Sequence, residues 1–322
     1  MDSAALAEVA SRIPGARVLV WGDVMLDAYL VGSVRRISPE APVPVIEVTD
    51  TYDRLGGAAN AAANCAALGA RTRLVGVTGA DAPADRLRHL LGAASVDGTL
   101  IASSGPTTVK QRLIATSQQV ARIDFEEPVA YSDALGDEVA AALRDAVADV
   151  DAVLVSDYAK GACAPVLIAG LVAAAQEAGR PVVVDPKGAD FARYRGATVI
   201  TPNEKEAREG SRSIADDLDE VVAELMGELP GTSLAVTRAE HGVRLFRPDA
   251  SPVTLPARAR SVADVTGAGD TVAAVMVAAM AVGADLEVAV ALANVAAGIA
   301  VEHLGTHAVS GDELAERITL EG

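Results

Sequence analysis

Short apolar runs, separated by segments long enough to form helices, constrain the fold of this chain most. The runs are rich in Val, Leu, Ile and Ala and cover residues 16–22, 71–79, 152–158, 181–187 and 197–203. Continuous apolar runs are typical of strands that are buried on both faces, and helices between them make such strands parallel. The sequence therefore predicts an α/β fold with three layers, α/β/α, around a mainly parallel central sheet.

The segments between and after these runs predict the helices. Helices are expected over about 56–68, 81–91, 132–148, 165–178, 271–282, 286–302 and 310–318. Residues 233–237 and 242–246 are expected to pair as a hairpin.

Two further regions predict a small β-sheet that is separate from the core. The stretch R-R-I-S-P-E-A-P-V-P-V-I-E-V (35–48) contains three prolines, which confine it to an edge or exposed strand. Lys110 and Arg112 lie on a short alternating strand, and residues 119–126 predict another. We expect these segments, about 28–50 and 104–125, to form a flap over a site or a contact between subunits.

The composition excludes some classes of partner. The 322 residues carry a formal net charge of −17, which argues against bulk affinity for nucleic acid or an anionic membrane. The longest apolar run, 271–284, is too short to span a bilayer. Cys65 and Cys163 have no metal or redox spacing, so buried free thiols in a reducing cytoplasm are expected. We also expect the histidines not to cluster, because Gly305 interrupts any helix between His303 and His307.

The stretch V-A-D-V-T-G-A-G-D-T-V-A-A (262–274) predicts a loop that turns into a buried helix. The first turn of a helix has unpaired N–H groups and a positive dipole end, and Gly267 and Gly269 allow an anion to approach closely. The dipole is expected to keep Asp270 ionised. This arrangement suits phosphoryl transfer: the amides hold charge on the phosphoryl group while Asp270 takes a hydroxyl proton. The alternative is a tight turn before an ordinary helix, with Asp270 as a first-turn acid.

Polar residues gather where the predicted strands end, which is the edge at which open α/β sheets bind ligands. Asp23 and Asp27 follow the first strand and can hydrogen-bond sugar hydroxyls, or they serve as turn residues. Later strands are followed by Asp157 and Lys160, by Asp185 and Lys187, and by Asn203 and Glu206. Their oxygens can hold Mg²⁺ directly or through water, and the lysines can face phosphate, although each position alone is also ordinary loop polarity.

Two helix positions are further candidates. Gly56 and Gly57 open an Ala-rich helix and allow close approach of a ligand, and Asn60 in its first turn can donate and accept hydrogen bonds. Asn294 is a lone polar residue in an apolar helix. It makes either a core hydrogen bond or a contact to adenine or nearby phosphates.

Other phosphate-binding and hydrolase motifs are missing. The sequence contains no G-x-x-x-x-G-K-[ST] and no G-x-S-x-G, and G-A-G-D-T-V lacks the third glycine of a dinucleotide fingerprint. These absences weaken P-loop, hydrolase and dehydrogenase interpretations.

Two motifs together, D-V-T-G-A-G-D-T (264–271) and G-G-A-A-N (56–60), resemble the ribokinase-like (PfkB) family of carbohydrate kinases. Longer stretches are similar to the branch of that family that phosphorylates D-glycero-β-D-manno-heptose 7-phosphate in ADP-heptose synthesis. They are G-D-V-M-L-D (22–27), R-I-S-P-E-A-P-V-P-V (36–45), S-D-Y-A-K-G-A (156–162), D-P-K-G-x-D-F-x-R-Y-R-G-A-T (185–198) and T-P-N-x-x-E (201–206). The resemblance covers about residues 16–310.

The resemblance implies a ribokinase-like fold with a small β lid, ATP and Mg²⁺ as cofactors, and transfer of the γ-phosphate to the C1 hydroxyl of this heptose phosphate to give the 1,7-bisphosphate. A ribokinase-like kinase for a different sugar or sugar phosphate is the alternative. A catalytically idle sugar-binding or regulatory protein is a remote one, because the G-A-G-D and N-x-x-E motifs are intact.

The resemblance also implies roles for individual residues. The catalytic set is Asp270 as base with Gly267, Ala268 and Gly269 as the anion hole. The nucleotide set is Asn203, Glu204, Lys205, Glu206, Thr237, Arg238, Gly242, Asp264 and Asn294, of which Asn203 and Glu206 organise Mg²⁺. The sugar set is Asp23, Asp27, Gly56, Gly57 and Asn60, with Lys110, Arg112, Lys160, Asp185 and Lys187 facing the substrate or its phosphate.

Relatives finally imply how the protein is organised. We expect a single kinase domain over 1–322 whose lid pairs two subunits into a cytoplasmic homodimer. Many relatives fuse this kinase to a nucleotidyltransferase domain, whereas this chain ends at Gly322. We therefore expect the adenylyl step to belong to another protein.

Overall fold

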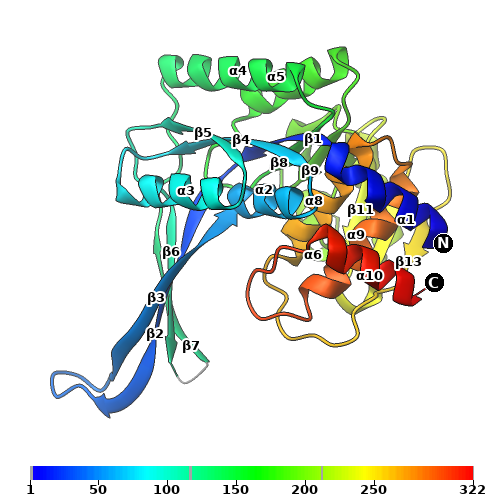
Figure 1. The fold of residues 1–322 in the computed structure, drawn as a ribbon. Coiled ribbons are helices and arrows are strands. Elements are labelled where there is room, and N and C mark those ends of the chain that lie inside the picture. Colours follow the sequence, from blue (N-terminus) through cyan, green and yellow to red (C-terminus); the bar gives the residue numbers. More distant parts are fainter. Residues whose placement is uncertain (1–2, 116–117, 212, 322) are drawn as a thin grey trace.

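A nine-stranded sheet forms the middle layer of the computed structural model, which describes residues 3–115, 118–211 and 213–321 (Figure 1). In spatial order the strands are β13 (Val253–Leu255), β12 (Val243–Phe246), β11 (Ser233–Thr237), β10 (Val199–Ile200), β9 (Val182–Asp185), β8 (Ala152–Ser156), β1 (Arg17–Gly22), β4 (Arg71–Thr78) and β5 (Asp97–Ala102). The strands from β11 to β5 are parallel, and β12 and β13 add an antiparallel edge. The mainly parallel sheet predicted from the sequence is confirmed.

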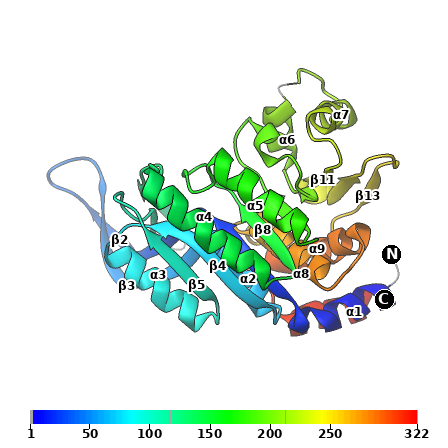
Figure 2. The ribbon, with the colours of Figure 1, turned by 90° about the horizontal axis from the view of Figure 1, so that it is seen from above.

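Helices cover both faces of this sheet (Figure 2). One face carries α1 (Ser3–Arg12), α2 (Ala58–Ala67), α3 (Ala82–Ala93), α8 (Ala268–Ala281), α9 (Leu286–Ala300) and α10 (Gly311–Glu321). The other carries α4 (Asp133–Ala148), α5 (Pro165–Glu177), α6 (Glu204–Ser211) and α7 (Leu218–Glu228). The strands are apolar throughout because alternate side chains enter the two cores: Val18 and Val20 pack on the first side, and Leu19 and Trp21 on the second.

Strand β10 is shorter than the sequence predicts. The apolar pattern extends over 197–203, but the strand covers only Val199–Ile200. Pro202 has no amide to donate to a ladder, and Asn203 makes only an isolated bridge to Thr237 before α6 begins. The chain therefore leaves the sheet early and places Asn203 at its carboxyl edge.

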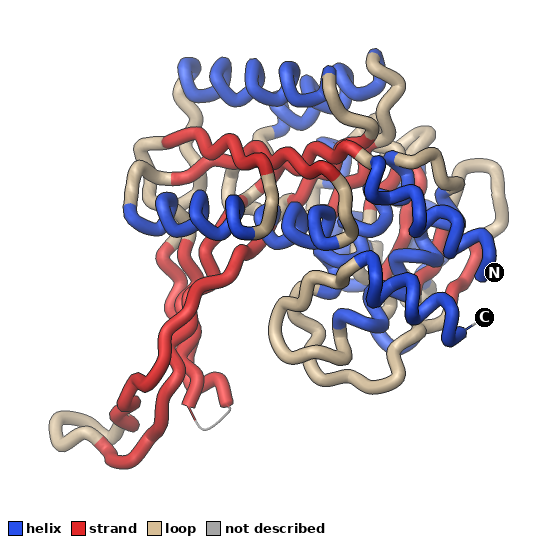
Figure 3. The backbone as a smooth tube through the Cα atoms, in the orientation of Figure 1, coloured by secondary structure: helices blue, strands red, loops and turns tan. Residues whose placement is uncertain are grey.

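A separate four-stranded sheet projects from the layers as a lid (Figures 1 and 3). Its strands, in the order β3, β2, β6, β7, are Pro44–Gly57, Val24–Ile37, Val109–Ala115 and Gln118–Phe125. The proline-bearing strand β3 lies at the edge, as the sequence predicts. Across the lid, Asp27 pairs in register with Arg54 on one side and with Lys110 on the other. The root of the lid thus gathers charged side chains beside the central sheet.

Across the described residues, no helix is both long enough and apolar enough to cross a lipid bilayer. Cys65 and Cys163 are buried free thiols, as expected.

Candidate active site

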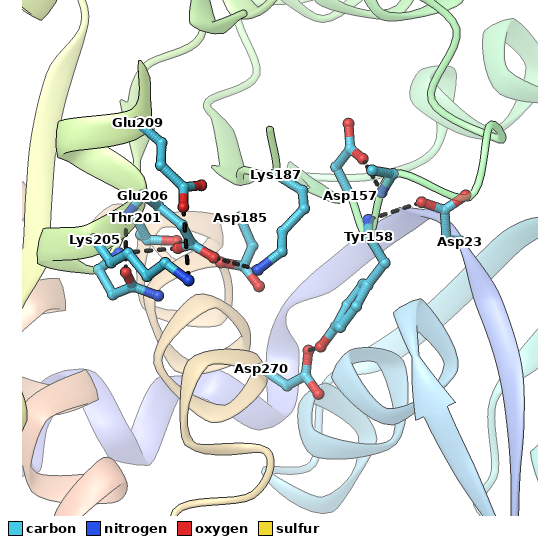
Figure 4. A network of polar contacts seen from close by, with 12 residues as sticks. Asp23, Asp157, Tyr158, Asp185, Lys187, Thr201, Lys205, Glu206, Glu209 and Asp270 are labelled. Carbon is cyan, nitrogen blue, oxygen red and sulfur yellow. Dashed lines mark hydrogen bonds and ion pairs between the residues drawn. The ribbon is translucent and has the colours of Figure 1, made fainter. Parts of the chain in front are cut away.

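Several of the predicted site residues lie together at the carboxyl ends of the parallel strands (Figure 4). Strand β1 leads to Asp23, β8 to Asp157 and Tyr158, and β9 ends at Asp185. The first turn of α8 brings Asp270 to the same edge. This is the position at which open parallel sheets bind ligands.

Asp270 is the most constrained carboxylate of the cluster. It lies in the first turn of α8 and is 4% exposed. One carboxylate oxygen, Oδ2, accepts a hydrogen bond from Asn60 Nδ2 at 2.6 Å, and Oδ1 accepts one from the Tyr158 hydroxyl at 2.7 Å. These two hydrogen bonds hold the carboxylate in a fixed orientation. Each oxygen keeps a second lone pair, so the carboxylate can still accept a proton.

Burial raises the pKa of Asp270 to about 6, and the nearby Asp27 adds to the rise. The hydrogen bonds from Asn60 and Tyr158 and the positive charge of Lys110 lower the pKa but do not cancel the effect of burial. The group is still ionised at neutral pH, as expected from the sequence, but its pKa is raised by burial, which the sequence did not reveal. The carboxylate remains mainly ionised at neutral pH and titrates close to it, which suits a general base.

The turn before Asp270 has the shape of an anion site. Gly267 is the N-cap of α8, with φ +81°, and a Cβ there would lie 3.1 Å from Thr306 Cγ2. A Cβ on Gly269 would meet no atom within 4 Å, so open space faces this residue. The amide of Ala268 makes a 3.3 Å bond to the Val265 carbonyl. In the described chain the amides of Gly269 and Asp270 have no acceptor, so they can bind an anion.

The paired glycines at the start of α2 let the lid root approach this turn. Gly57 has φ +57°, and a Cβ would lie 2.3 Å from the Asp23 carbonyl oxygen. A Cβ on Gly56 would lie 3.0 Å from Asp27 Oδ2. These glycines therefore allow the close packing that places Asn60 within reach of Asp270.

Asp23 and Asp27 have different surroundings. The Asp23 carboxylate accepts backbone N–H bonds from Tyr158, Lys160 and Ala162, at 2.7, 3.0 and 2.9 Å. It is 2% exposed, so these bonds favour a structural role for Asp23 over a contact with sugar hydroxyls. Asp27 Oδ1 accepts a 2.6 Å bond from Arg112, which crosses the lid from β6.

The basic residues predicted to face the substrate differ in whether a carboxylate of the protein pairs with them. Arg112 pairs with Asp27, and Lys160 pairs with Glu126 at 2.7 Å. Among the described residues Lys110 has no carboxylate within ion-pair distance, and burial lowers its pKa. Its Nζ lies 5.7 Å from the centre of the Tyr158 ring. Lys110 is thus a cation at the site that is available to a substrate anion.

Residues from β9 and α6 form an acidic cluster beside Asp270 (Figure 4). Asn203 and Glu206 exchange backbone-to-side-chain bonds of 3.0 and 2.9 Å, the capping box of α6, and Lys187 Nζ lies 2.7 Å from Glu206 Oε1. Burial raises the pKa of Asp185 well above its usual range, and the negative charges of Asp270 and Glu206 raise it further. This excess of negative charge would be relieved by a divalent cation, so the residues fit a Mg²⁺ site.

The remaining nucleotide candidates lie further along the same edge, and most have protein partners. Arg238 pairs with Glu204, while Lys205 points outward and pairs with Glu209. Asp264 accepts bonds from Thr266 and from the Gly305 amide.

Gly242, with φ +81°, would collide with the Leu255 carbonyl oxygen if it carried a Cβ. Thr237 ends β11, where its amide donates to the Pro202 carbonyl. Asn294 donates to the Pro256 carbonyl at 2.7 Å, which is the core hydrogen bond considered for it from the sequence.

The structure adds residues that sequence reasoning missed. Tyr158 contacts Asp270, and Arg54 donates from the lid to the Thr306 carbonyl at 2.9 Å. The only sequence signal for Tyr158 was its place in S-D-Y-A-K-G-A. The expectation that the histidines do not cluster is wrong, because His303 and His307 stack with ring centres 3.8 Å apart. Their rings are nearly parallel, at 17°, and His303, His307 and Glu313 each present a ligand atom within 4.8 Å of the others, so the three residues could hold a metal ion.

Comparisons with known proteins place this chain in a family. Residues 16–312 match the model of the pfkB family of carbohydrate kinases. The chain is 49% identical over 310 residues to the bifunctional protein HldE of Alcanivorax borkumensis, covering 95% of this chain and 64% of that protein. It is 52% identical over 314 residues to the protein of the same name from Pseudomonas fluorescens, covering 96% and 65%. The chain thus spans about two thirds of the length of these relatives.

Solved structures share the fold at low sequence identity. Arabidopsis thaliana ribokinase in complex with ribose and ATP aligns with a TM-score of 0.73 and 21% identity, over 94% of this chain and 98% of that one. The tetrameric inhibited form of Escherichia coli phosphofructokinase-2 aligns with a TM-score of 0.77 and 18% identity, over 95% and 99%. With the family match over 16–312, these findings show that the chain is an enzyme of the pfkB carbohydrate kinase family.

Proposed function

We propose that this kinase transfers the γ-phosphate of ATP to the C1 hydroxyl of D-glycero-β-D-manno-heptose 7-phosphate and releases the 1,7-bisphosphate for ADP-heptose synthesis. Support for the substrate comes from the stretches 36–45 and 156–162, and from about 50% identity to the HldE proteins over almost the whole chain. The observation that carries the chemistry is the oriented Asp270 carboxylate beside the open turn at Gly267–Gly269.

In the proposed reaction Asp270 accepts the proton of the attacking C1 hydroxyl. The hydroxyl oxygen attacks the γ-phosphorus in line, and ADP leaves. The amides of Gly269 and Asp270 hold negative charge on the transferred phosphoryl group, with Gly267 and Ala268 completing the turn. The lid covers the site and excludes water, which would otherwise accept the phosphoryl group.

Membership of the family implies ATP as the phosphoryl donor. We further propose that Mg²⁺ is held through water by Glu206 and Asn203, with Asp185 contributing charge. Mg²⁺ supplies neutralisation of the phosphate oxygens when bound. Both Glu206 oxygens accept hydrogen bonds from Lys187 and Asn203, which favours contact through water over direct ligation. Glu204, Lys205, Thr237, Arg238, Gly242, Asp264 and Asn294 are proposed to border the nucleotide.

The sugar phosphate is proposed to bind between the lid and the sheet edge. Asp27, Gly56 and Gly57 border the position of the sugar hydroxyls. Lys110, which has no carboxylate partner in the described chain, is proposed to receive the substrate's own phosphate. Arg112, Lys160, Asp185 and Lys187 complete this side.

The exposed apolar side chains of the lid support a homodimer that pairs through it. Ile37, Val43 and Val48 are 61%, 51% and 48% exposed, and Ile123 and Phe125 are 43% and 54% exposed. Several exposed apolar groups on and beside one small sheet are typical of an interaction surface. We also propose a cytoplasmic location, because ATP is the donor and both cysteines are free thiols.

A substrate panel tests the proposed function. The kcat/KM for Mg-ATP-dependent ADP release is compared for the heptose 7-phosphate, ribose, fructose and fructose 6-phosphate. We expect the heptose 7-phosphate to be preferred by orders of magnitude. Preference for another sugar would keep the kinase chemistry but replace the substrate, and Lys110 would then return to an ordinary lid residue.

A further inference from the structure

Tyr158 makes a hydrogen bond to Asp270 that has no part in the proton transfer proposed above. Its side chain is partly buried and points from the loop after β8 toward the start of α8 (Figure 4). The hydroxyl donates to Asp270 Oδ1 at 2.7 Å, opposite the 2.6 Å bond from Asn60 to Oδ2. The two donors come from segments about 100 residues apart in sequence and hold the carboxylate between them.

The loop that carries Tyr158 is itself held in place. Asp23 accepts the amides of Tyr158, Lys160 and Ala162, so a buried carboxylate fixes the backbone on both sides of residue 159. Lys110 on lid strand β6 lies over the tyrosine ring, with Nζ 5.7 Å from its centre. The hydroxyl is therefore presented to Asp270 by an anchored backbone and a ring in contact with the lid.

We infer that Tyr158 is a positioning residue for the catalytic base: its hydroxyl orients the Asp270 carboxylate and stabilises its ionised form. This inference rests on the proposed role of Asp270 as base. It also gives Asp23 a defined part, as the anchor of the loop that presents Tyr158.

The charges around Asp270 explain why such a donor is needed. Asp27 on β2 and Asp185 on β9 face Asp270 with like charge, and Lys110 on β6 is the opposing cation. Burial raises the pKa of Tyr158 well above its usual range, so its hydroxyl remains a donor over the working pH range. A hydrogen bond to the charged form lowers a carboxyl pKa, so the tyrosine offsets part of the effect of burial.

The inference is tested with Tyr158→Phe, which removes the hydroxyl and keeps the ring. Tyr131→Phe is the matched control, because the Tyr131 hydroxyl donates at 2.7 Å to the Ala162 carbonyl of the same loop and does not contact Asp270. The kcat/KM for heptose 7-phosphate is measured with saturating Mg-ATP from pH 5 to pH 9, and ATP affinity is measured by calorimetry.

We expect the acidic limb of the pH profile of Tyr158→Phe to move up by about one pH unit, so that its activity at pH 6 falls roughly fivefold more than its activity at pH 8. ATP affinity should be unchanged, and Tyr131→Phe should keep the wild-type profile. An unmoved acidic limb in Tyr158→Phe overturns the inference. A Tyr158→Phe variant with a lowered KM for the heptose 7-phosphate and an unchanged kcat also overturns the inference. In that case the tyrosine hydroxyl would merely occupy the position of the acceptor alcohol.

Asp270→Asn separates this result from failure of the proposed function. If Asp270→Asn keeps near-normal turnover, the base assignment itself fails. If Asp270→Asn is inactive and Tyr158→Phe keeps the wild-type limb, only the role of Tyr158 fails. If Tyr158→Phe shows no turnover at any pH, the pKa of Asp270 is read from carboxyl ¹³C shifts assigned with Asp270→Asn. A value raised relative to the wild type supports the inference, and an unchanged value overturns it.

Discussion

Replacing Asp270 with Asn should abolish most turnover and, at pH 8, stabilise the folded protein. Burial raises the pKa of this carboxyl from 3.8 to about 6. At a pH above both values the folded protein keeps a buried charge that the unfolded chain exposes to water. A difference of about two pKa units at 1.36 kcal/mol per unit corresponds to about 3 kcal/mol of lost stability. Asn avoids this cost but leaves one donor, from Asn60 or Tyr158, poorly paired, so we expect a net gain of about 1–2 kcal/mol.

The destabilisation caused by the buried Asp270 charge depends on pH. The cost of Asp270 is fully present above pH 6 and disappears as the pH falls through the folded pKa toward the unfolded one, where both states bind the proton. At pH 4.5 about a third of the cost should remain. The stabilising effect of Asp270→Asn should therefore shrink between pH 8 and pH 4.5, or reverse.

Urea unfolding followed by circular dichroism at these two pH values measures the effect. Asp264→Asn is the matched control, because bonds from Thr266 and Gly305 lower the pKa of Asp264 against the effect of its partial burial, and this variant should destabilise at pH 8. An Asp270→Asn protein that is less stable than the wild type at pH 8, by an amount independent of pH, would refute the reasoning.

Four further changes test other parts of the site and the lid. Gly269→Ala should fold normally, because nothing lies within 4 Å of the added methyl group, and should lower kcat about tenfold or more by filling the space for the anion. Gly267→Ala should instead lower the melting temperature, because φ of Gly267 is +81° and Thr306 would lie 3.1 Å from the added methyl group. Lys110→Met should raise KM for the sugar phosphate roughly tenfold and leave KM for ATP unchanged, as steady-state kinetics can show. Phe125→Glu should shift the protein toward monomer in light scattering, because this 54% exposed side chain lies on the lid.

The sheet and the base could be predicted because their signals are local. Apolar runs and the G-A-G-D turn are contiguous, and the structure places Asp270 in the first turn of a buried helix as that pattern indicates. The lid was also predictable, because prolines at 39, 42 and 44 exclude a central strand there and the residues around 110 and 112 alternate as in a short strand.

The contacts between distant segments could not be predicted. Tyr158 and Asp270 are 112 residues apart, and no spacing rule connects them. Asp23 looked like a sugar ligand because it follows a strand, but three backbone amides 135 to 139 residues later in sequence occupy its carboxylate. The pKa of Asp270 depends on burial by side chains from distant segments, whereas the sequence revealed only the helix dipole.

The most direct test of the proposed function is the position of the transferred phosphate. The protein is incubated with Mg-ATP and D-glycero-D-manno-heptose 7-phosphate, and the products are followed by phosphorus NMR. We predict a new anomeric phosphate signal beside the retained 7-phosphate, formed by the wild type and absent with Asp270→Asn. A product that is phosphorylated elsewhere, or no transfer to this sugar while another sugar is phosphorylated, would contradict the proposal.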